Sequence, residues 1–367
     1  NGFTQKNIKT FTKQLQELGF DYDWSKMIAT SDPEFYHWTQ WIFKQLYNDG
    51  YAKYVDMPVN WCEELGTVLS NDEVIDGKSE RGGYPVIRKN MKQLCIDQAA
   101  FAERLLEGLN EIDWPESTKE MQRNWIGRST GVEVQFEIVG GGKFSIFTTC
   151  IETIYGITFM VLAPDGDLVQ ELMPRIKNQD EVKAYIQETV SKSEMDRTEL
   201  NKGKTGCRLE GIKAINPVNG REVEVFIGDF VLANYGTGAV MAVPSHDQRD
   251  FEYAIAHNID RIQVIEGQDV SEHAFEKQGY LGKGCKLINS EEFTGLTVEE
   301  AKVAITKKLV DMGIAKETVN YRFREWIFAR QRYWGEPVPI VHLEDGTDYV
   351  LPDEELPLIL PELEDYK

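Results

Sequence analysis

Long hydrophobic runs are missing from this sequence, and cysteine and positive charge are in short supply. No stretch approaches the roughly 18–20 apolar residues that a membrane helix requires, and no signal peptide is recognisable. The five cysteines are odd in number and none has CxxC spacing, which excludes a disulfide scaffold and suits a reducing cytosol. The 61 acidic residues outnumber the 40 basic ones, and the net charge of −21 argues against a surface that coats nucleic acid. A local basic track is compatible with this charge. We expect a cytoplasmic protein that does not associate with membranes.

Familiar catalytic signatures are also missing, because the sequence contains no GxSxG elbow, HExxH pair or Walker motif. What remains is ordinary globular composition, with 367 residues of which 41% are hydrophobic, enough for two or three domains. Apolar spacing predicts helices over 5–18, from Pro33 onward and over 94–113. Strand-like alternation follows at Val132, Val134, Phe136 and Ile138. The pattern predicts an α/β protein in which a domain of 129–318 is inserted into another whose pieces flank it.

Three threonines within six residues form the first candidate site: Thr148, Thr149 and Thr153. They follow an expected strand, so their hydroxyls are expected to line a loop over the end of a sheet. Hydroxyls of this kind position a water or a ribose rather than act as strong nucleophiles. The alternative is that threonine is simply a favourable strand residue.

The run 235–244 is rich in small residues, which on a strand allow a ligand or another backbone to approach closely. It is not a phosphate loop, since neither GK[ST] nor GxGxxG is present. A tightly packed strand without a ligand explains the same composition.

The run 245–250 predicts the start of a helix, because Ser245 and Gln248 match a capping box. Asp247 is a candidate partner of the helix dipole. Asp250 lies one turn further, on a face shared with Asp247 and His246, where an exposed carboxylate would suit a substrate ammonium group. His246 with Asp247 hints at a metal, but no second His or Cys lies nearby, so we expect none.

Taken together, several segments resemble a bacterial leucyl-tRNA synthetase, a class I aminoacyl-tRNA synthetase. The matching runs follow the order of that family and are LGFDYDWS (18–25), VNWC (59–62), TVLSNDEVIDG (67–77), MQRNWIGRS (121–129), YGTGAVMAVPSHDQRDFEYA (235–254) and RQRYWGEP (330–337). The HIGH-type and KMSKS-type signatures of the family do not occur in these residues. The resemblance therefore implies a middle piece that does not aminoacylate and needs no cofactor, although the full-length enzyme uses ATP.

The resemblance also implies a domain plan. Residues 1–58, 91–128 and 319–367 would be pieces of a Rossmann-type class I synthetase catalytic domain, and 59–90 a zinc-type module. The inserted domain of 129–318 would be a mixed, β-barrel-like editing domain with surrounding helices. In the zinc-type module only Cys62 remains of the expected thiolate ligands, and one thiolate cannot form a tetrahedral site. The resemblance thus predicts no zinc here.

Roles for individual residues follow from the resemblance. Asp250 would bind the ammonium group of the substrate, Thr148 and Thr149 would position the water and the ribose, and Thr153 would obstruct leucine. The residues that would shape the pocket are Tyr235, Met241 and Val243, and secondary candidates are Glu152, His246 and Asp247.

The loop departs from the bacterial pattern TTRPDT, since it reads Thr148-Thr149-Cys150-Ile151-Glu152-Thr153. Cysteine in place of arginine removes a guanidinium group whose hydrogen-bond donors have a fixed geometry, and isoleucine in place of proline raises the conformational entropy of the loop. The resemblance predicts a monomer that binds the acceptor end of tRNA(Leu) and hydrolyses the amino acid ester when isoleucine, norvaline or a similar residue is attached. The alternative is a noncatalytic fragment that binds the tRNA 3′ end without hydrolysis.

Overall fold

The computed structural model describes residues 2–75, 77–190, 197, 205–233, 237–323, 325–328 and 336–361. The chain divides into two compact units, one formed by Asn1–Ala52 with Arg332–Lys367 and the other by Lys53–Gln331. None of the described helices is long and apolar enough to cross a membrane.

The described residues of the first unit form two α-helices, two short 3-10 helices and a small hairpin. Helix α1 (Gly2–Glu17) and helix α2 (Pro33–Asn48) confirm the helices predicted at both positions. The buried Gln40 amide donates to the carbonyls of Pro337 and Leu358 and accepts from the Leu358 N–H, which ties α2 to the C-terminal segment. The remaining elements of this unit are η1 (Trp24–Lys26), β14 (Ile340–His342), β15 (Asp348–Val350) and η7 (Asp353–Glu355).

The second unit begins with a four-stranded sheet of order β13-β5-β1-β2. Its elements, with a small hairpin and the helices that follow, are β1 (Ala52–Cys62), β2 (Thr67–Leu69), η2 (Asn71–Glu73), β3 (Val74–Ile75), β4 (Lys78–Ser79), β5 (Ile87–Ile96), η3 (Ala99–Phe101), α3 (Ala102–Gly108), α4 (Glu116–Ile126) and β13 (Trp326–Ile327).

The helix predicted over 94–113 is wrong in its first part. Cys95 and Ile96 belong to β5 and pair with β13, because sheet pairing with a distant segment overrides a local helical period.

The larger sheet of the second unit contains seven strands. Six of them follow the order β11-β8-β10-β9-β6-β12, and the seventh, β7, pairs with β6. The β8–β10 pair is parallel and the other described pairs are antiparallel. Its strands are β6 (Ser129–Ile138), β7 (Lys143–Thr148), β8 (Phe159–Leu162), β9 (Gly206–Ile215), β10 (Glu222–Gly228), β11 (Ala239–Ala242) and β12 (Ala315–Asn320). The sheet curls until β7 and β11 lie close together, but no pairing among the described strands closes it into a barrel.

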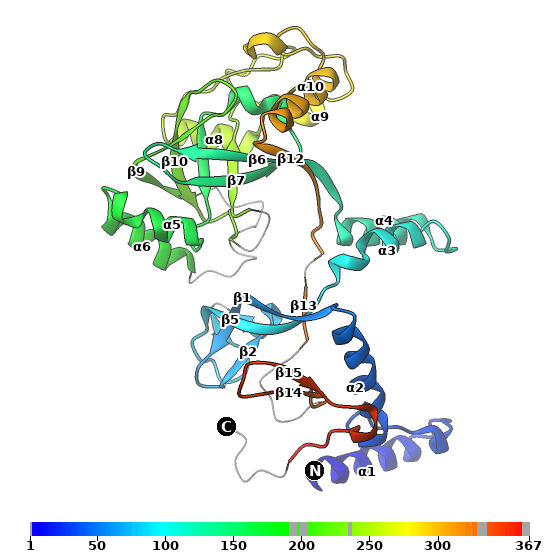
Figure 1. Ribbon diagram of the computed structural model, residues 1–367. Helices are drawn as coiled ribbons and strands as arrows, with labels where there is room; N and C mark the ends of the chain where they lie inside the picture. Colours follow the sequence, from blue (N-terminus) through cyan, green and yellow to red (C-terminus); the bar gives the residue numbers. More distant parts are fainter. Residues whose placement is uncertain are drawn as a thin grey trace. The chain divides into compact units, whose positions relative to one another are not determined.

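Helices surround this curved sheet, so the fold is mixed α/β. They are η4 (Ile151–Gly156), α5 (Asp167–Leu172), η5 (Met173–Arg175), α6 (Gln179–Val190), α8 (Gln248–Ala256), α9 (Lys277–Tyr280), η6 (Glu291–Phe293) and α10 (Val298–Asp311). Helix α6 packs against β9, and α10 packs against β12 and η4 (Figure 1).

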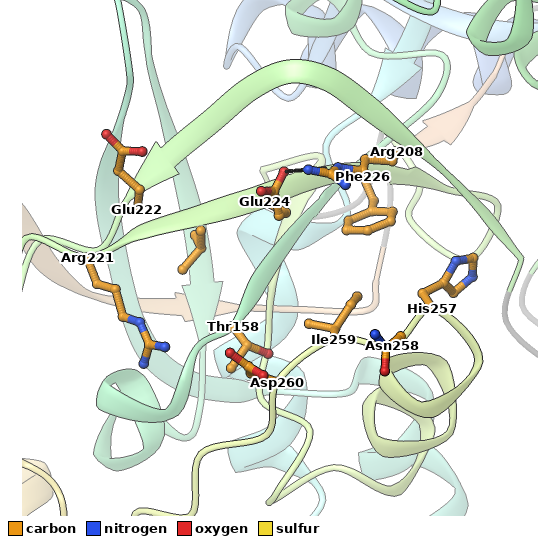
Figure 2. Close-up of a pocket in the computed structure, with 11 residues that line it drawn as sticks. Thr158, Arg208, Arg221, Glu222, Glu224, Phe226, His257, Asn258, Ile259 and Asp260 are labelled. Carbon is orange, nitrogen blue, oxygen red and sulfur yellow. Dashed lines mark hydrogen bonds and ion pairs between the residues drawn. The ribbon is translucent and has the colours of Figure 1, made fainter.

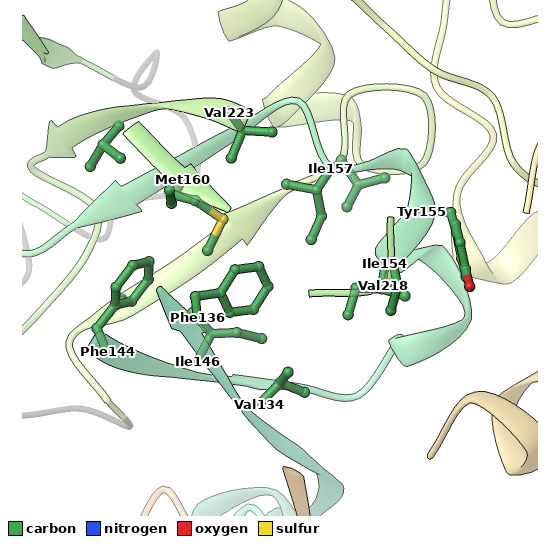
Figure 3. Packing of buried hydrophobic residues seen from close by; sticks show 14 of the residues in the cluster. Val134, Phe136, Phe144, Ile146, Ile154, Tyr155, Ile157, Met160, Val218 and Val223 are labelled. Atoms are coloured by element: carbon green, nitrogen blue, oxygen red, sulfur yellow. The ribbon is translucent and has the colours of Figure 1, made fainter. Parts of the chain in front are cut away.

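The core lies inside the curve of the sheet. The alternating apolar residues of β6 are all buried, which confirms the prediction of a strand with one face in the core. They pack with residues of β7, η4 and β8, and Figure 3 shows Phe136, Phe144, Ile146 and Met160 interlocking. The rings of Phe136 and Phe144 stack with centroids 5.8 Å apart. This rigid core carries the loop that follows β7.

Candidate active site

The loop from β7 to η4 is braced by its own threonine hydroxyls. Thr148 is the last residue of β7, and its Oγ1 accepts the Cys150 N–H at 3.0 Å. Thr153 Oγ1 donates to the Cys150 carbonyl at 2.8 Å, and the Thr153 N–H donates to the same oxygen at 3.1 Å. Local bonds of this kind hold a turn without help from a sheet. The loop is therefore a rigid feature, with Thr148 and Thr153 less than a tenth exposed.

Thr149 differs from its neighbours because it is only half-buried. Its Oγ1 lies 3.6 Å from the half-buried Cys150 Sγ. Of the three candidate threonines, Thr149 is the most exposed residue.

Asp250 lies in the first turn of α8, close to the end of β11. Its carboxylate is buried, with 8% of the residue exposed, and Oδ2 accepts the Val243 N–H at 3.0 Å. The carboxylate that the sequence offered as a partner for an ammonium group is therefore buried rather than exposed. The α8 helix packs back onto the turn that follows β11, and that turn covers the side chain.

Asp247, not Ser245, caps α8. Asp247 Oδ1 accepts the N–H groups of Arg249 and Asp250 at 2.9 and 3.1 Å, which is the usual role of an N-cap carboxylate. The predicted capping box is wrong, because Ser245 is fully buried and its Oγ has no partner among the described residues. The helix begins at Gln248, so a turn of 243–247 separates it from β11.

His246 is a buried structural residue with both ring nitrogens engaged. Nδ1 lies 3.0 Å from the Phe275 carbonyl, and Nε2 accepts the Val264 N–H at 3.0 Å. These partners assign the proton to Nδ1. Burial lowers the pKa of His246 to about 4, so the ring is neutral at physiological pH. Neither nitrogen is available to a metal, and the described residues contain no group of three or more candidate metal ligands.

Glu152 points into the interior rather than toward a substrate. It has no exposed surface, and its Oε1 accepts the Tyr280 hydroxyl at 3.3 Å. Its Oε2 has no hydrogen-bond partner in the part of the chain that the structure describes. Burial raises the pKa of Glu152, against the opposing charges of Lys302 and Lys277.

Contacts between distant segments bring the loop and the turn together. Val243 packs against Gly156 at the end of η4, where an added β-carbon would lie 3.0 Å from Val243 Cγ1. Tyr280 contacts both the loop and the turn. Its hydroxyl donates to Glu152, and its ring packs edge-on against His246 with the ring centroids 6.0 Å apart. The structure therefore gathers the threonine loop, the turn and α8 at one end of the sheet.

The remaining sequence candidates fall in three places. Met241 is half-buried on β11, the strand that lies close to β7, and Val243 is buried in the turn beyond it. Tyr235 lies outside the described residues. Sequence reasoning missed Tyr280 and Lys302, whose Nζ donates to the Thr149 carbonyl at 3.0 Å. No local signal marks either residue, because each sits in an ordinary helical segment.

A separate open pocket of about 380 Å³ lies at the opposite end of α8 (Figure 2). Arg208 and Glu224 form an ion pair across its wall, with Arg208 Nη2 and Glu224 Oε2 2.7 Å apart. His257 and Asn258 border it from the C-terminal end of α8. The pocket is lined by none of the loop threonines and not by Asp250, so it is distinct from the candidate site.

The chain matches two known protein families. A family model described as tRNA synthetases class I (I, L, M and V) matches residues 2–202, which places the chain in that class of synthetases. A second model, leucyl-tRNA synthetase, editing domain, matches residues 123–310, which is half of the chain. The chain belongs to the leucyl-tRNA synthetase family.

A solved structure agrees with this assignment. The chain is similar to the agnB2 leucyl-tRNA synthetase (LeuRS) of Agrobacterium radiobacter K84, whose crystal structure is a ternary complex with tRNA and LeuAMS. The two are 31% identical, with a TM-score of 0.75, and the match covers 98% of this chain. The chain spans 41% of the length of that synthetase.

Proposed function

We propose that this chain hydrolyses the ester bond of tRNA(Leu) that carries a wrong amino acid, such as isoleucine or norvaline. The observation that supports this proposal is the braced Thr148–Thr153 loop, which leads into Gly156 and through it contacts Val243, the residue whose N–H bonds Asp250. Both segments lie in the part of the chain that matches the editing-domain family. The ligand would be the acceptor end of the tRNA with its amino acid ester. We further propose that the chain acts as a monomer in the cytoplasm and without a cofactor, because water is the only co-reactant that ester hydrolysis needs.

In the proposed reaction the buried Asp250 carboxylate binds the ammonium group of the amino acid. Its Oδ2 is already oriented by the Val243 N–H, so the charge is held in position before substrate arrives. The half-buried Thr149 hydroxyl is suited to bond the ribose or the attacking water. Water adds to the ester carbonyl carbon, the bond from that carbon to the ribose oxygen breaks, and a proton passes to the ribose oxygen. The products are the free amino acid and an uncharged tRNA end.

Thr153 is the proposed gate against leucine. The pocket in which a synthetase selects its amino acid separates side chains that differ by one methylene by a binding free energy of only about 1–3 kcal/mol. A second selection step at the editing site is therefore useful. Thr153 is almost fully buried and its hydroxyl is committed to the Cys150 carbonyl, which leaves its methyl as the group that can exclude a side chain. Met241 and Val243 would form the walls of that pocket, with Tyr235 as a further candidate.

A noncatalytic tRNA-binding role is the second candidate function. The hydroxyls of Thr148 and Thr153 both bond within their own loop, and Cys150 stands where relatives of the bacterial type carry arginine. A loop whose hydroxyls are already satisfied could bind the tRNA end without activating water.

Single-turnover deacylation decides between the two functions. Purified chain is mixed with isoleucyl-tRNA(Leu) or leucyl-tRNA(Leu), and the loss of the ester is followed against a reaction without protein. The proposal requires that the isoleucyl ester be hydrolysed at least about tenfold faster than the leucyl ester. Binding of both tRNAs without any hydrolysis would establish the noncatalytic role instead.

A further inference from the structure

Lys302 reaches from α10 to the candidate loop. Thr297 and Glu300 form a capping box that fixes the start of this helix, and the helix packs against η4. The half-buried Lys302 side chain extends to the Thr149 carbonyl, with Nζ and the oxygen 3.0 Å apart. A hydrogen bond from an ammonium group to a carbonyl is stronger than one between neutral groups.

This hydrogen bond holds one end of the Thr149–Cys150 peptide group, and Thr148 holds the other end. The Thr149 carbonyl and the Cys150 N–H belong to the same peptide group, which is planar. Lys302 binds the carbonyl, and Thr148 Oγ1 accepts the N–H at 3.0 Å. If either partner is lost, the plane is free to rotate about the flanking backbone bonds. Rotation would move the carbonyl and the N–H away from their present partners and loosen the backbone that carries the Thr149 hydroxyl.

The loop has no basic residue of its own. Residues 148–153 read Thr-Thr-Cys-Ile-Glu-Thr, and the one ionisable carboxyl, that of Glu152, is buried with one oxygen unpartnered among the described residues. Lys302 and Lys277 are the cations whose charge acts on that carboxyl. Of these two, Lys302 also makes a hydrogen bond to the loop backbone.

We propose that Lys302 is a positioning residue of the editing site, which holds the Thr149–Cys150 peptide so that Thr149 faces the substrate. The proposal rests on the proposed hydrolytic function for its effect on rate. Its structural part, that Lys302 holds the loop, does not depend on that function. Two readouts therefore test it, one with substrate and one without.

The first readout is the rate of hydrolysis by Lys302→Met, which keeps the length of the side chain and removes the donor. We expect kcat for isoleucyl-tRNA(Leu) to fall about tenfold with KM unchanged, and Lys302→Arg to restore it to within about threefold. The control is Lys307→Met on the same helix, where an exposed lysine pairs with Asp311 and should leave both constants unchanged. An unchanged kcat, or a raised KM that marks a phosphate contact, would overturn the proposal.

The second readout is the alkylation of Cys150 by iodoacetamide, measured by mass spectrometry without tRNA. Cys285 is the internal reference, because it is also half-buried and its carbonyl accepts the Val298 N–H at the start of α10. In Lys302→Met we expect Cys150 to react several-fold faster while Cys285 is unchanged, and Lys307→Met to change neither. Equal Cys150 rates in Lys302→Met and the unaltered chain would refute the positioning role. A chain that hydrolyses no ester but shows the alkylation effect would disprove the proposed function alone.

Discussion

Asp250 illustrates how one buried carboxylate combines a structural and a proposed binding role. Its Oδ2 accepts the Val243 N–H, so substitution by alanine would remove a hydrogen bond of the fold together with the charge. A buried N–H without an acceptor is expensive, and the resulting loss of stability would obscure any effect on catalysis. Asparagine is the sharper change because it keeps an oxygen for Val243 and removes the charge, at the expense of replacing the second carboxylate oxygen by an amide nitrogen.

We expect Asp250→Asn to lower kcat/KM for isoleucyl-tRNA(Leu) by about 10- to 100-fold, the value of one charge-assisted hydrogen bond to the ammonium group. The free energy of unfolding should change by less than about 1 kcal/mol, because the bond to Val243 is retained. Asp247→Asn is the matched control, since asparagine caps helices as well as aspartate does and should leave hydrolysis intact. Full activity of Asp250→Asn would remove Asp250 from the proposed site.

Substitutions at Thr153 can separate two roles of its side chain, the proposed exclusion of leucine by the methyl group and the hydrogen bond that holds the loop. Thr153→Ser keeps the hydroxyl that bonds the Cys150 carbonyl and deletes the methyl, whereas Thr153→Ala deletes both. If the methyl excludes leucine, both variants should hydrolyse leucyl-tRNA(Leu) about 10- to 200-fold faster, with little change for the isoleucyl ester. Deacylation assays on the two esters measure this ratio. If only the alanine variant hydrolyses leucyl-tRNA(Leu) faster, the effect comes from loss of the hydrogen bond to the Cys150 carbonyl and not from loss of the methyl.

At the scale of elements, the pairing of β6 with β7 controls the position of Thr148. Gly131 on β6 lies so close to β7 that a β-carbon at this position would be 2.3 Å from the Thr148 carbonyl oxygen. Neighbouring Val132 pairs with Thr148 in the strand register. Glycine is therefore required here by a close approach of two backbones rather than by an unusual dihedral angle.

Gly131→Ala should push β7 away from β6 and displace Thr148. We expect a loss of about 1–3 kcal/mol in the free energy of unfolding, measured by urea denaturation, and slower hydrolysis of the isoleucyl ester. Gly108→Ala at the end of α3 is the control, since no atom lies within 4 Å of the added carbon and stability should be unchanged or slightly higher. Native stability in Gly131→Ala would contradict this account of the strand pair.

The turn between β11 and α8 is held by His246, and this makes the stability of the site depend on pH. The folded pKa of His246 is lowered to about 4 by burial, below the usual value of about 6.5 in an unfolded chain. Protons therefore bind the unfolded state preferentially. The stability due to neutral His246 is complete above about pH 6.5 and is lost as pH falls toward 4.

We expect the free energy of unfolding to fall by about 1.4 kcal/mol per pH unit from this group between pH 6.5 and 4. Urea denaturation at several pH values should show that His246→Gln flattens the slope by this amount. Identical slopes for the unaltered chain and His246→Gln would show that another group titrates.

At the scale of the whole molecule, the net charge of −21 opposes tRNA, which is itself a polyanion. Recognition in the proposed function is restricted to the acceptor end, so few phosphates can be neutralised. For roughly two or three phosphate contacts, affinity for tRNA(Leu) should fall only about tenfold between 50 and 200 mM salt. Filter binding or fluorescence anisotropy across this range measures the slope. A fall of a thousandfold or more would reveal a basic tRNA track that the proposed function does not include.

Local patterns in the amino-acid sequence were enough to predict several parts of this protein. The helices at 2–17 and 33–48 and the buried alternation of β6 follow from apolar periodicity and from proline in a first helical turn. The clustering of threonines before a second apolar run located the loop, and the resemblance to leucyl-tRNA synthetases gave the family that the matches show.

How those parts meet could not be predicted in this way, because the contacts between them join residues far apart in the chain. Cys95 and Ile96 lie in a strand because β13, more than 200 residues later, pairs with them. Asp250 is buried and Ser245 is no cap, because the turn after β11 folds back onto α8. Tyr280 and Lys302 reach the threonine loop from helices whose local sequence carries no mark of a site. Periodicity records which face of an element is apolar, whereas the partner of each polar atom is set by long-range packing.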